Sequence, residues 1–205
     1  GIIVQSGNDA SIALAECLGG TEKDFAKLMN VYAERLGMTN TNFVNSSGWP
    51  DDNHYSTVKD LGILSNAIIK DFPNLYTYFK MEEFTYNDIS QPNRNKLLYQ
   101  VQGADGLKTG FTKESGWGIA ATALRNDRRI TVVINGTNSS RSRLNESSNL
   151  INWAFNQTSQ QTLVEKDQFI KEVDVWLGSE SSINLISAQK LVSTLSFDQI
   201  PVSYT

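Results

Sequence analysis

The chain has 205 residues and a mass of 22.8 kDa, and its 40% hydrophobic and 20% charged residues exclude a collagen, a coiled coil and a disordered tail. The 18 lysines and arginines against 22 aspartates and glutamates give a net charge of −4, which argues against a nucleic-acid binder. One cysteine and one histidine exclude an internal disulfide and the common zinc motifs, and no apolar stretch reaches the ~18 residues of a membrane span, so we expect no metal, no cofactor and no transmembrane helix.

The chain begins with two predicted helices. Residues 9–18 form the first helix, capped by Asn8 or Asp9 and with an apolar face that includes Leu18. Residues 22–36 form the second helix, because their apolar side chains recur every three or four positions. We expect the apolar face of this second helix to be buried in the core.

A loop and a third helix follow. Residues 38–55 are rich in Asn, Ser, Gly, Pro and Asp, which predicts a long ordered loop. The third helix is predicted from residue 56 or 57 to about residue 70, with Val58 and Leu64 among its inward side chains.

The middle of the chain changes to an alternating pattern. This pattern predicts strands over residues 106–112, 116–124 and 129–136, with a hairpin turn over 125–128 and therefore antiparallel pairing. A further helix is predicted over about 142–155. Helices around an antiparallel sheet place the fold in the α/β class, of the α+β type.

A domain boundary is predicted near residue 160. Residues 156–161 are polar and resemble a linker, and strand-like alternation follows at Val173, Val175 and Leu177. We therefore predict one domain over residues 1–159 and the beginning of a small β-rich domain over 160–205, which is incomplete because so short a segment has little core.

Two short motifs carry the chemistry. Ser6-Gly7-Asn8 lies just before the first predicted helix, and Lys108-Thr109-Gly110 opens the first predicted strand. Either motif alone is weak, since a lysine such as Lys108 is usually a solvated strand residue. Together and in this order, they resemble the second and third motifs of penicillin-recognising serine enzymes, whose set is Ser-x-x-Lys, Ser-x-Asn and Lys-Thr-Gly.

The resemblance extends along the chain and is to the D-alanyl-D-alanine carboxypeptidases of the low-molecular-mass penicillin-binding protein type. It implies a β-lactamase/transpeptidase-like catalytic domain followed by a β-rich domain. The matching segments occur in family order and are 5–10, 54–57, 93–98, 106–112 and the helix from Arg141 through Glu146 to Trp153.

The resemblance also implies roles for individual residues. Ser6 would relay a proton to the leaving D-alanine, Asn8 would hydrogen-bond the substrate or a catalytic lysine, and Lys108 would add positive charge. The backbone of Thr109 and the strand edge after Gly110 would pair with the substrate, and the backbone N–H of Phe111 would be half of an oxyanion hole. The catalytic residues would thus be Ser6, Asn8 and Lys108, and the substrate-binding residues Lys108, Thr109, Gly110, Phe111 and Arg143.

Several other residues have competing interpretations. Arg143 matches the family position that holds the substrate carboxylate, and the alternative is an exposed helix arginine. We interpret Arg94 and Asn95 as bracing the active-site loops, His54 as a loop residue with local hydrogen bonds, and Cys17 as a small core residue.

The first family motif is missing from its expected place before Ser6. Two strings fit Ser-x-x-Lys, at 56–59 and 187–190, but both follow Ser6 and we reject them as nucleophiles. We therefore expect the chain to lack an N-terminal part that carries the nucleophile and to be inactive alone, as a piece of a serine carboxypeptidase.

Three alternative functions compete with the carboxypeptidase interpretation. A class A-like β-lactamase would need a deacylating glutamate between the second and third motifs, and no Glu-x-x-Leu-Asn occurs there. A non-catalytic peptidoglycan-binding relative would keep the groove without the nucleophile, and a generic α/β domain would carry the motifs by chance. By resemblance, the partners are stem peptides ending in D-Ala-D-Ala and β-lactam antibiotics. The location would be extracytoplasmic, with membrane-surface association through a segment outside these residues.

Overall fold

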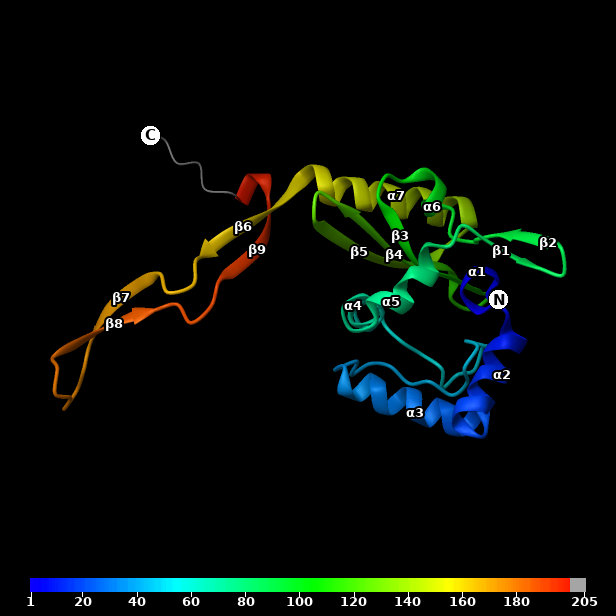
Figure 1. Cartoon of the computed structure of the whole chain (residues 1–205), viewed down its shortest axis with the longest axis horizontal. Coiled ribbons are helices and arrows are strands. Elements are labelled where there is room, and N and C mark those ends of the chain that lie inside the picture. Colours follow the sequence, from blue (N-terminus) through cyan, green and yellow to red (C-terminus); the bar gives the residue numbers. More distant parts are fainter. Residues whose placement is uncertain (200–205) are drawn as a thin grey trace. The chain divides into compact units, whose positions relative to one another are not determined.

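The computed structural model describes residues 1–199 and divides into two compact units, Gly1–Asn152 and the residues from Trp153 onward (Figure 1). The first unit contains most of the helical segments, a three-stranded sheet and a two-stranded hairpin. The predicted domain boundary near residue 160 stays a prediction, because the compact units describe packing and leave open which segments fold as independent domains.

Two helices of the first unit have threonine caps. Thr21 and Thr57 each accept a hydrogen bond from the backbone N–H three residues later, at 3.1 Å, which satisfies an otherwise unpaired donor. The predicted cap of α2 (Asn8–Gly19) by Asn8 or Asp9 is wrong, because Gly7 is the N-cap residue of that helix and no side chain caps it. Residues 38–55 lack regular helix and strand, as predicted. The helical segments are α1 (Ile2–Gln5), α2 (Asn8–Gly19), α3 (Glu22–Arg35), α4 (Val58–Asp71), α5 (Pro73–Tyr76), η1 (Thr77–Lys80), α6 (Leu97–Gln100) and α7 (Ser140–Gln157).

The central sheet is antiparallel, as predicted. Its strands are β3 (Ala104–Thr112), β4 (Gly116–Arg125) and β5 (Arg128–Thr137), in the order β3-β4-β5. The hairpin between β4 and β5 turns at Asn126 and Asp127, whose φ values of 48° and 60° match the turn that suits twisted strands. Within the described residues, β3 is therefore an edge strand.

The sheet is covered by α4 on one face and by α7 on the other (Figure 1). Leu107, Ile119 and Ala121 alternate with polar or small residues along β3 and β4, and they are buried on the α7 side, where Ile151 of α7 is also buried. On the opposite face, Thr131 of β5 donates a hydrogen bond to Asn66 of α4. One face of the sheet thus packs apolar side chains towards α7, whereas the other face makes a polar contact with α4.

The predicted burial of the second helix is confirmed at Ala33 but wrong for other positions of its apolar face, and the predicted core position of Cys17 is wrong. Leu18 and Tyr32 are 64% and 53% exposed, and Cys17 is exposed as well. Helices α2 and α3 meet at Gly19, where a Cβ added to the glycine would lie only 2.8 Å from Phe25. The close contact between the two helices therefore depends on the small size of this residue. The apolar side chains line an open groove instead, formed by Phe25, Leu28, Met29, Tyr32, Ala33, Leu36, Met38, Phe43 and Leu64.

Other predicted inward positions are also exposed. Val58 of α4 is 50% exposed. Leu150 of α7, whose apolar side chain also follows a helical pattern, is 40% exposed, while α7 buries Arg143 and Ser147. Helical periodicity locates a face of the helix, but neighbouring elements decide how much of it is covered.

A small hairpin was not predicted. Strands β1 (Glu83–Tyr86) and β2 (Ile89–Pro92) pair around Asn87 and Asp88, both with positive φ. The Asn-Asp pair between two short alternating segments is the signal that would have indicated it.

The residues from Trp153 onward include two antiparallel strand pairs. The predicted linker over 156–161 is wrong, because α7 continues to Gln157 and β6 starts at the next residue, where Thr158 Oγ1 donates to the carbonyl of Ala154. Leu177, which was predicted to belong to a strand, instead lies in a turn with φ 57°. The pairs are β6 (Thr158–Val164) with β9 (Leu191–Ser196) and β7 (Phe169–Asp174) with β8 (Ser182–Ile186), followed by η2 (Phe197–Gln199).

Among residues 1–199, none of the helices is long and apolar enough to cross a membrane.

Candidate active site

Ser6 lies in an unusual backbone conformation between two helices. It ends α1 with φ 58° and ψ 41°, and its N–H donates to the carbonyl of Ile2 at 3.0 Å. A non-glycine residue in this left-handed region costs about 1–2 kcal/mol, and such strain is concentrated at functional sites. The hydrogen bond from Gln5 Nε2 to the carbonyl of Pro92 and the buried side chain of Val4 hold α1 in place.

Lys108 reaches Ser6 across 102 positions of sequence. Its Nζ donates to Ser6 Oγ at 2.7 Å and to the carbonyl of Thr109 at 2.9 Å. Lys108 pairs with Ala120 on β4, two positions from the Gly106–Thr122 pair, so it shares the α4-side face with Thr122. The structure therefore joins the two motifs that the sequence placed far apart.

The surroundings of Lys108 make proton loss easier. Burial, followed by the positive charges of Arg94 and Arg143, lowers the pKa of Lys108 to about 8. Among residues 1–199, none of these three cations forms an ion pair with a carboxylate. The site therefore keeps a positive charge that suits an anionic ligand.

Of the remaining predicted site residues, Thr109, Gly110 and Phe111 lie on β3, whereas Asn8 lies on α2. Asn8 is exposed at the first position of α2, and the Thr109 side chain is buried at 8% exposure. A Cβ added to Gly110 would contact nothing within 4 Å, so open space lies beside the strand there. The ring of Phe111 lies 4.3 Å from that of Trp117 on β4.

Arg143 is buried at this end of the sheet. It is 7% exposed, so its interpretation as an exposed helix arginine is wrong. Its guanidinium lies over the Trp117 ring, 5.3 Å from the centroid, and Nη1 donates a long hydrogen bond of 3.5 Å to the carbonyl of Gly110. Burial lowers the pKa of Arg143 from its usual value, but an arginine stays charged at neutral pH.

The supporting roles predicted for the nearby loops fit the observed contacts. Asn95 is 1% exposed and its Nδ2 donates to the carbonyl of Gly106 on β3 at 3.1 Å, so it braces the strand that carries Lys108. His54 Nδ1 accepts from the N–H of Val44 at 3.3 Å, and burial lowers its pKa. His54 is thus a structural loop residue, as predicted.

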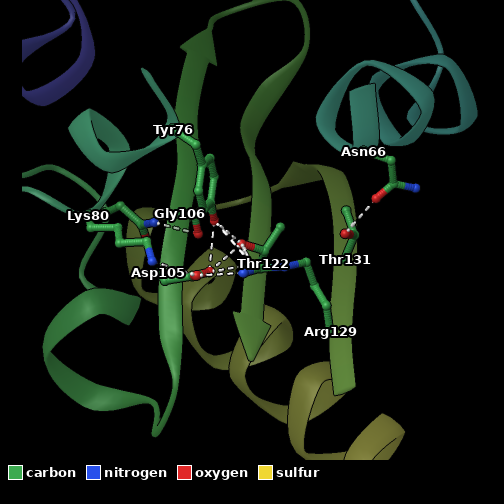
Figure 2. Close-up of polar contacts among 9 residues, drawn as sticks. Asn66, Tyr76, Lys80, Asp105, Gly106, Thr122, Arg129 and Thr131 are labelled. Atoms are coloured by element: carbon green, nitrogen blue, oxygen red, sulfur yellow. Dashed lines mark hydrogen bonds and ion pairs between the residues drawn. The ribbon is translucent and has the colours of Figure 1, made fainter. Parts of the chain in front are cut away.

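One polar cluster escaped the sequence analysis. Asp105 is linked to Tyr76, Thr122 and Arg129 just before the Lys108 motif (Figure 2). Tyr76 and Arg129 come from different elements, and only the position of Asp105 beside the motif could have drawn attention to it. The described residues contain no cluster of three or more metal-ligating side chains.

Comparison with known proteins identifies the family. The model of the D-alanyl-D-alanine carboxypeptidase family matches residues 1–138. The chain belongs to this family. The D-alanyl-D-alanine carboxypeptidase DacC of Escherichia coli is 41% identical over 186 residues, which are 90% of this chain and 46% of DacC.

Solved structures of penicillin-binding proteins have the same fold. Penicillin-binding protein 5 of Haemophilus influenzae matches 96% of this chain and 58% of its own, with a TM-score of 0.83 and 36% identity. Penicillin-binding protein D2 of Listeria monocytogenes, in an ampicillin-bound form, matches 76% of this chain and 65% of its own, with a TM-score of 0.70 and 34% identity. The predicted family and fold class are therefore confirmed. The chain spans about half the length of the curated relatives it matches.

Proposed function

We propose that the protein containing this chain is a serine-type D-alanyl-D-alanine carboxypeptidase that trims the terminal D-alanine from peptidoglycan stem peptides and is acylated by penicillins. The observation that carries the proposal is the 2.7 Å hydrogen bond between Lys108 Nζ and Ser6 Oγ, in a chain that belongs to the D-alanyl-D-alanine carboxypeptidase family. Its substrates end in a carboxylate, which suits the unpaired positive charge around Lys108.

The proposed chemistry needs a proton path to the leaving group. A serine oxygen attacks the carbonyl carbon of the penultimate D-alanine while its hydroxyl proton passes to a neighbouring base. The amide C–N bond then breaks, and the freed nitrogen takes up that proton. Ser6, with its hydroxyl held by Lys108, is placed to pass on that proton, and a water later hydrolyses the ester. With a pKa of about 8, Lys108 is mostly charged at neutral pH and supports this step as a donor.

Substrate binding is assigned to the edge of β3. Because β3 is an edge strand within residues 1–199, its backbone near Thr109 can pair with an extended peptide, and Gly110 leaves space for that approach. Arg143 would hold the terminal carboxylate, the Phe111 N–H would bind the developing oxyanion, and Asn8 would hydrogen-bond the substrate or a catalytic lysine.

The nucleophile is proposed to lie outside these 205 residues. Ser56 Oγ is hydrogen-bonded to Thr41, and Lys190 pairs with Glu165 in the second unit. Neither Ser-x-x-Lys string makes a hydrogen bond to Ser6 or Lys108 within the described part of the chain. The chain alone is therefore expected to be inactive.

Location and attachment follow from the proposed substrate. An enzyme of the peptidoglycan would act outside the cytoplasm, at the periplasmic or outer face of the cytoplasmic membrane. By the family resemblance, attachment to that membrane is proposed to use a segment outside these 205 residues.

The test is the intact mass of the full-length protein before and after incubation with excess penicillin, together with assay of D-alanine released from a pentapeptide. A stable increment of one penicillin with D-alanine release supports the proposal. A penicillin hydrolysed rapidly with no lasting adduct would favour the β-lactamase alternative, and no adduct at all would favour a non-catalytic binding protein.

A further inference from the structure

The Asp105 carboxylate is the centre of a saturated polar network (Figure 2). Its Oδ1 accepts hydrogen bonds of 2.7 Å each from Tyr76 OH, Thr122 Oγ1 and Arg129 Nη1, and its Oδ2 accepts from Arg129 Nη2 at 2.8 Å. Lys80 Nζ lies 3.5 Å from Oδ2. One carboxylate therefore connects β3, β4, β5, α5 and η1.

The protonation states of this network are fixed. Burial by itself raises the pKa of Asp105, but hydrogen bonds from Arg129, Thr122 and Tyr76 outweigh burial and leave the pKa below its usual value. Burial raises the pKa of Tyr76 well above its usual range. Asp105 is thus an acceptor and Tyr76 a donor at neutral pH.

Asp105 is also the extra residue of a β-bulge. Ala104 pairs with Ala123, and Gly106 pairs with Thr122, so Asp105 has no partner on β4. A bulge sets the pairing register of all the strand residues that follow it. A shift of the β3 register by one residue would turn Lys108 to the opposite face of the sheet. The network holds this bulge through the Asp105 side chain.

Gly106, between Asp105 and Lys108, is held from two sides. A Cβ at Gly106 would lie 2.7 Å from Tyr76 OH, so the strand passes directly against that hydroxyl. Its carbonyl accepts from Asn95 Nδ2. Little freedom is left in the strand before Lys108.

We propose that Asp105 is a positioning residue: by fixing the β3 bulge through Arg129, Thr122 and Tyr76, it holds the Lys108 amine against Ser6. The inference rests on the proposed function only for its effect on acylation. The placement of Lys108 itself can be measured without any substrate.

The test is the Asp105→Asn variant of the full-length protein, which keeps the shape of the side chain and removes its charge. The pKa of Lys108 is read by NMR of lysine labelled at Cε, and acylation by a fluorescent penicillin is measured alongside. We expect the Lys108 pKa to rise from about 8 towards 10.5, because the amine leaves its buried position. Acylation should fall about 10- to 100-fold, as expected for a displaced catalytic group.

The direct electrostatic effect of removing the Asp105 charge would shift the Lys108 pKa in the opposite direction. The direction of the measured pKa shift therefore distinguishes loss of positioning from loss of charge. Loss of a nearby carboxylate lowers the pKa of a lysine, so a downward shift or no shift would overturn the proposal. If neither protein reacts with penicillin, the proposed function fails, while the pKa measurement still tests the positioning of Lys108.

Two further variants separate positioning from a general loss of stability. Tyr76→Phe removes one of the hydrogen-bond donors to Asp105 and should shift the Lys108 pKa in the same direction by a smaller amount. This variant tests the proposal if Asp105→Asn does not fold. Asp60→Asn makes the same chemical change at another buried aspartate, on α4, which accepts from Asn40 N–H and Thr41 Oγ1. It should leave the Lys108 pKa unchanged, and an equal shift would contradict the proposal.

Discussion

Two charged regions on the same face of the sheet are built in opposite ways. At Asp105 the carboxylate is surrounded by donors, and Arg129 pairs with both of its oxygens. Three positions further along β3, Lys108 is buried beside Arg94 and Arg143, with no carboxylate partner among residues 1–199. The first arrangement satisfies its charge internally and fixes the strand, whereas the second leaves charge available for a ligand.

The largest expected effect is the loss of acylation when the unpaired charge is removed. Lys108→Met in the full-length protein should lower the second-order rate constant for penicillin acylation by about 100-fold or more, because the Ser6 hydroxyl loses its donor. Stopped-flow fluorescence with a labelled penicillin measures this. Lys27→Met, which removes an exposed lysine on α3 paired with Asp24, is the matched control and should leave the rate constant unchanged. A Lys108 variant as fast as the wild type would remove Lys108 from the mechanism.

Arg143 should affect substrate binding more than the chemical step. Arg143→Gln should raise the KM for a pentapeptide by about 10- to 100-fold, since a hydrogen-bonded charge is worth about 1.5–3 kcal/mol. Steady-state release of D-alanine gives KM and kcat separately. Arg94→Gln is the control, since Arg94 is exposed and also contributes to the lowered Lys108 pKa. Equal KM changes in the two variants would show that overall charge, and not a carboxylate contact, is responsible.

The smallest expected effect is on the free energy of unfolding. Lys108→Met, which should lower activity, should make the folded protein more stable at pH 7. Because the folded pKa of Lys108, about 8, is below the unfolded value near 10.5, the folded protein binds fewer protons between these pH values. Wild-type stability should therefore rise with pH in this window relative to Lys108→Met. At pH 7 the variant should be more stable by roughly 1–3 kcal/mol.

Urea denaturation of both proteins from pH 7 to pH 10 checks this prediction. A stability difference that stays constant with pH would mean that Lys108 is not buried as a cation. In contrast, Asp105→Asn should lower stability at pH 7, since it breaks a satisfied buried pair.

The elements were predictable where the signal is local. Thr21 and Thr57 cap the helices that their sequences indicate, and Asn126-Asp127 gives the turn that fixes the antiparallel hairpin. These features depend on residues within a few positions of one another, so a single sequence reveals them. The resemblance to the family is also visible in a single sequence, because it rests on short motifs that occur in a fixed order.

Burial was less predictable, because it depends on what covers a face. Leu18 and Tyr32 follow helical periodicity yet are exposed, and Cys17 is exposed rather than buried. Arg143 looked equally suited to solvent, yet it is buried against Trp117. The periodicity of apolar residues shows which face of a helix is apolar, and only the neighbouring elements determine whether that face is buried.

The sequence by itself determined the two threonine caps and the hairpin, since each depends on local backbone preferences, and it carries the two motifs on which the resemblance to the family rests. Only the tertiary structure decided that Ser6 and Lys108 touch, that burial and two arginines lower the Lys108 pKa, and that Asp105 sets the register of β3. These contacts join residues tens of positions apart, and their strength comes from desolvation and geometry that exist only after the chain has folded.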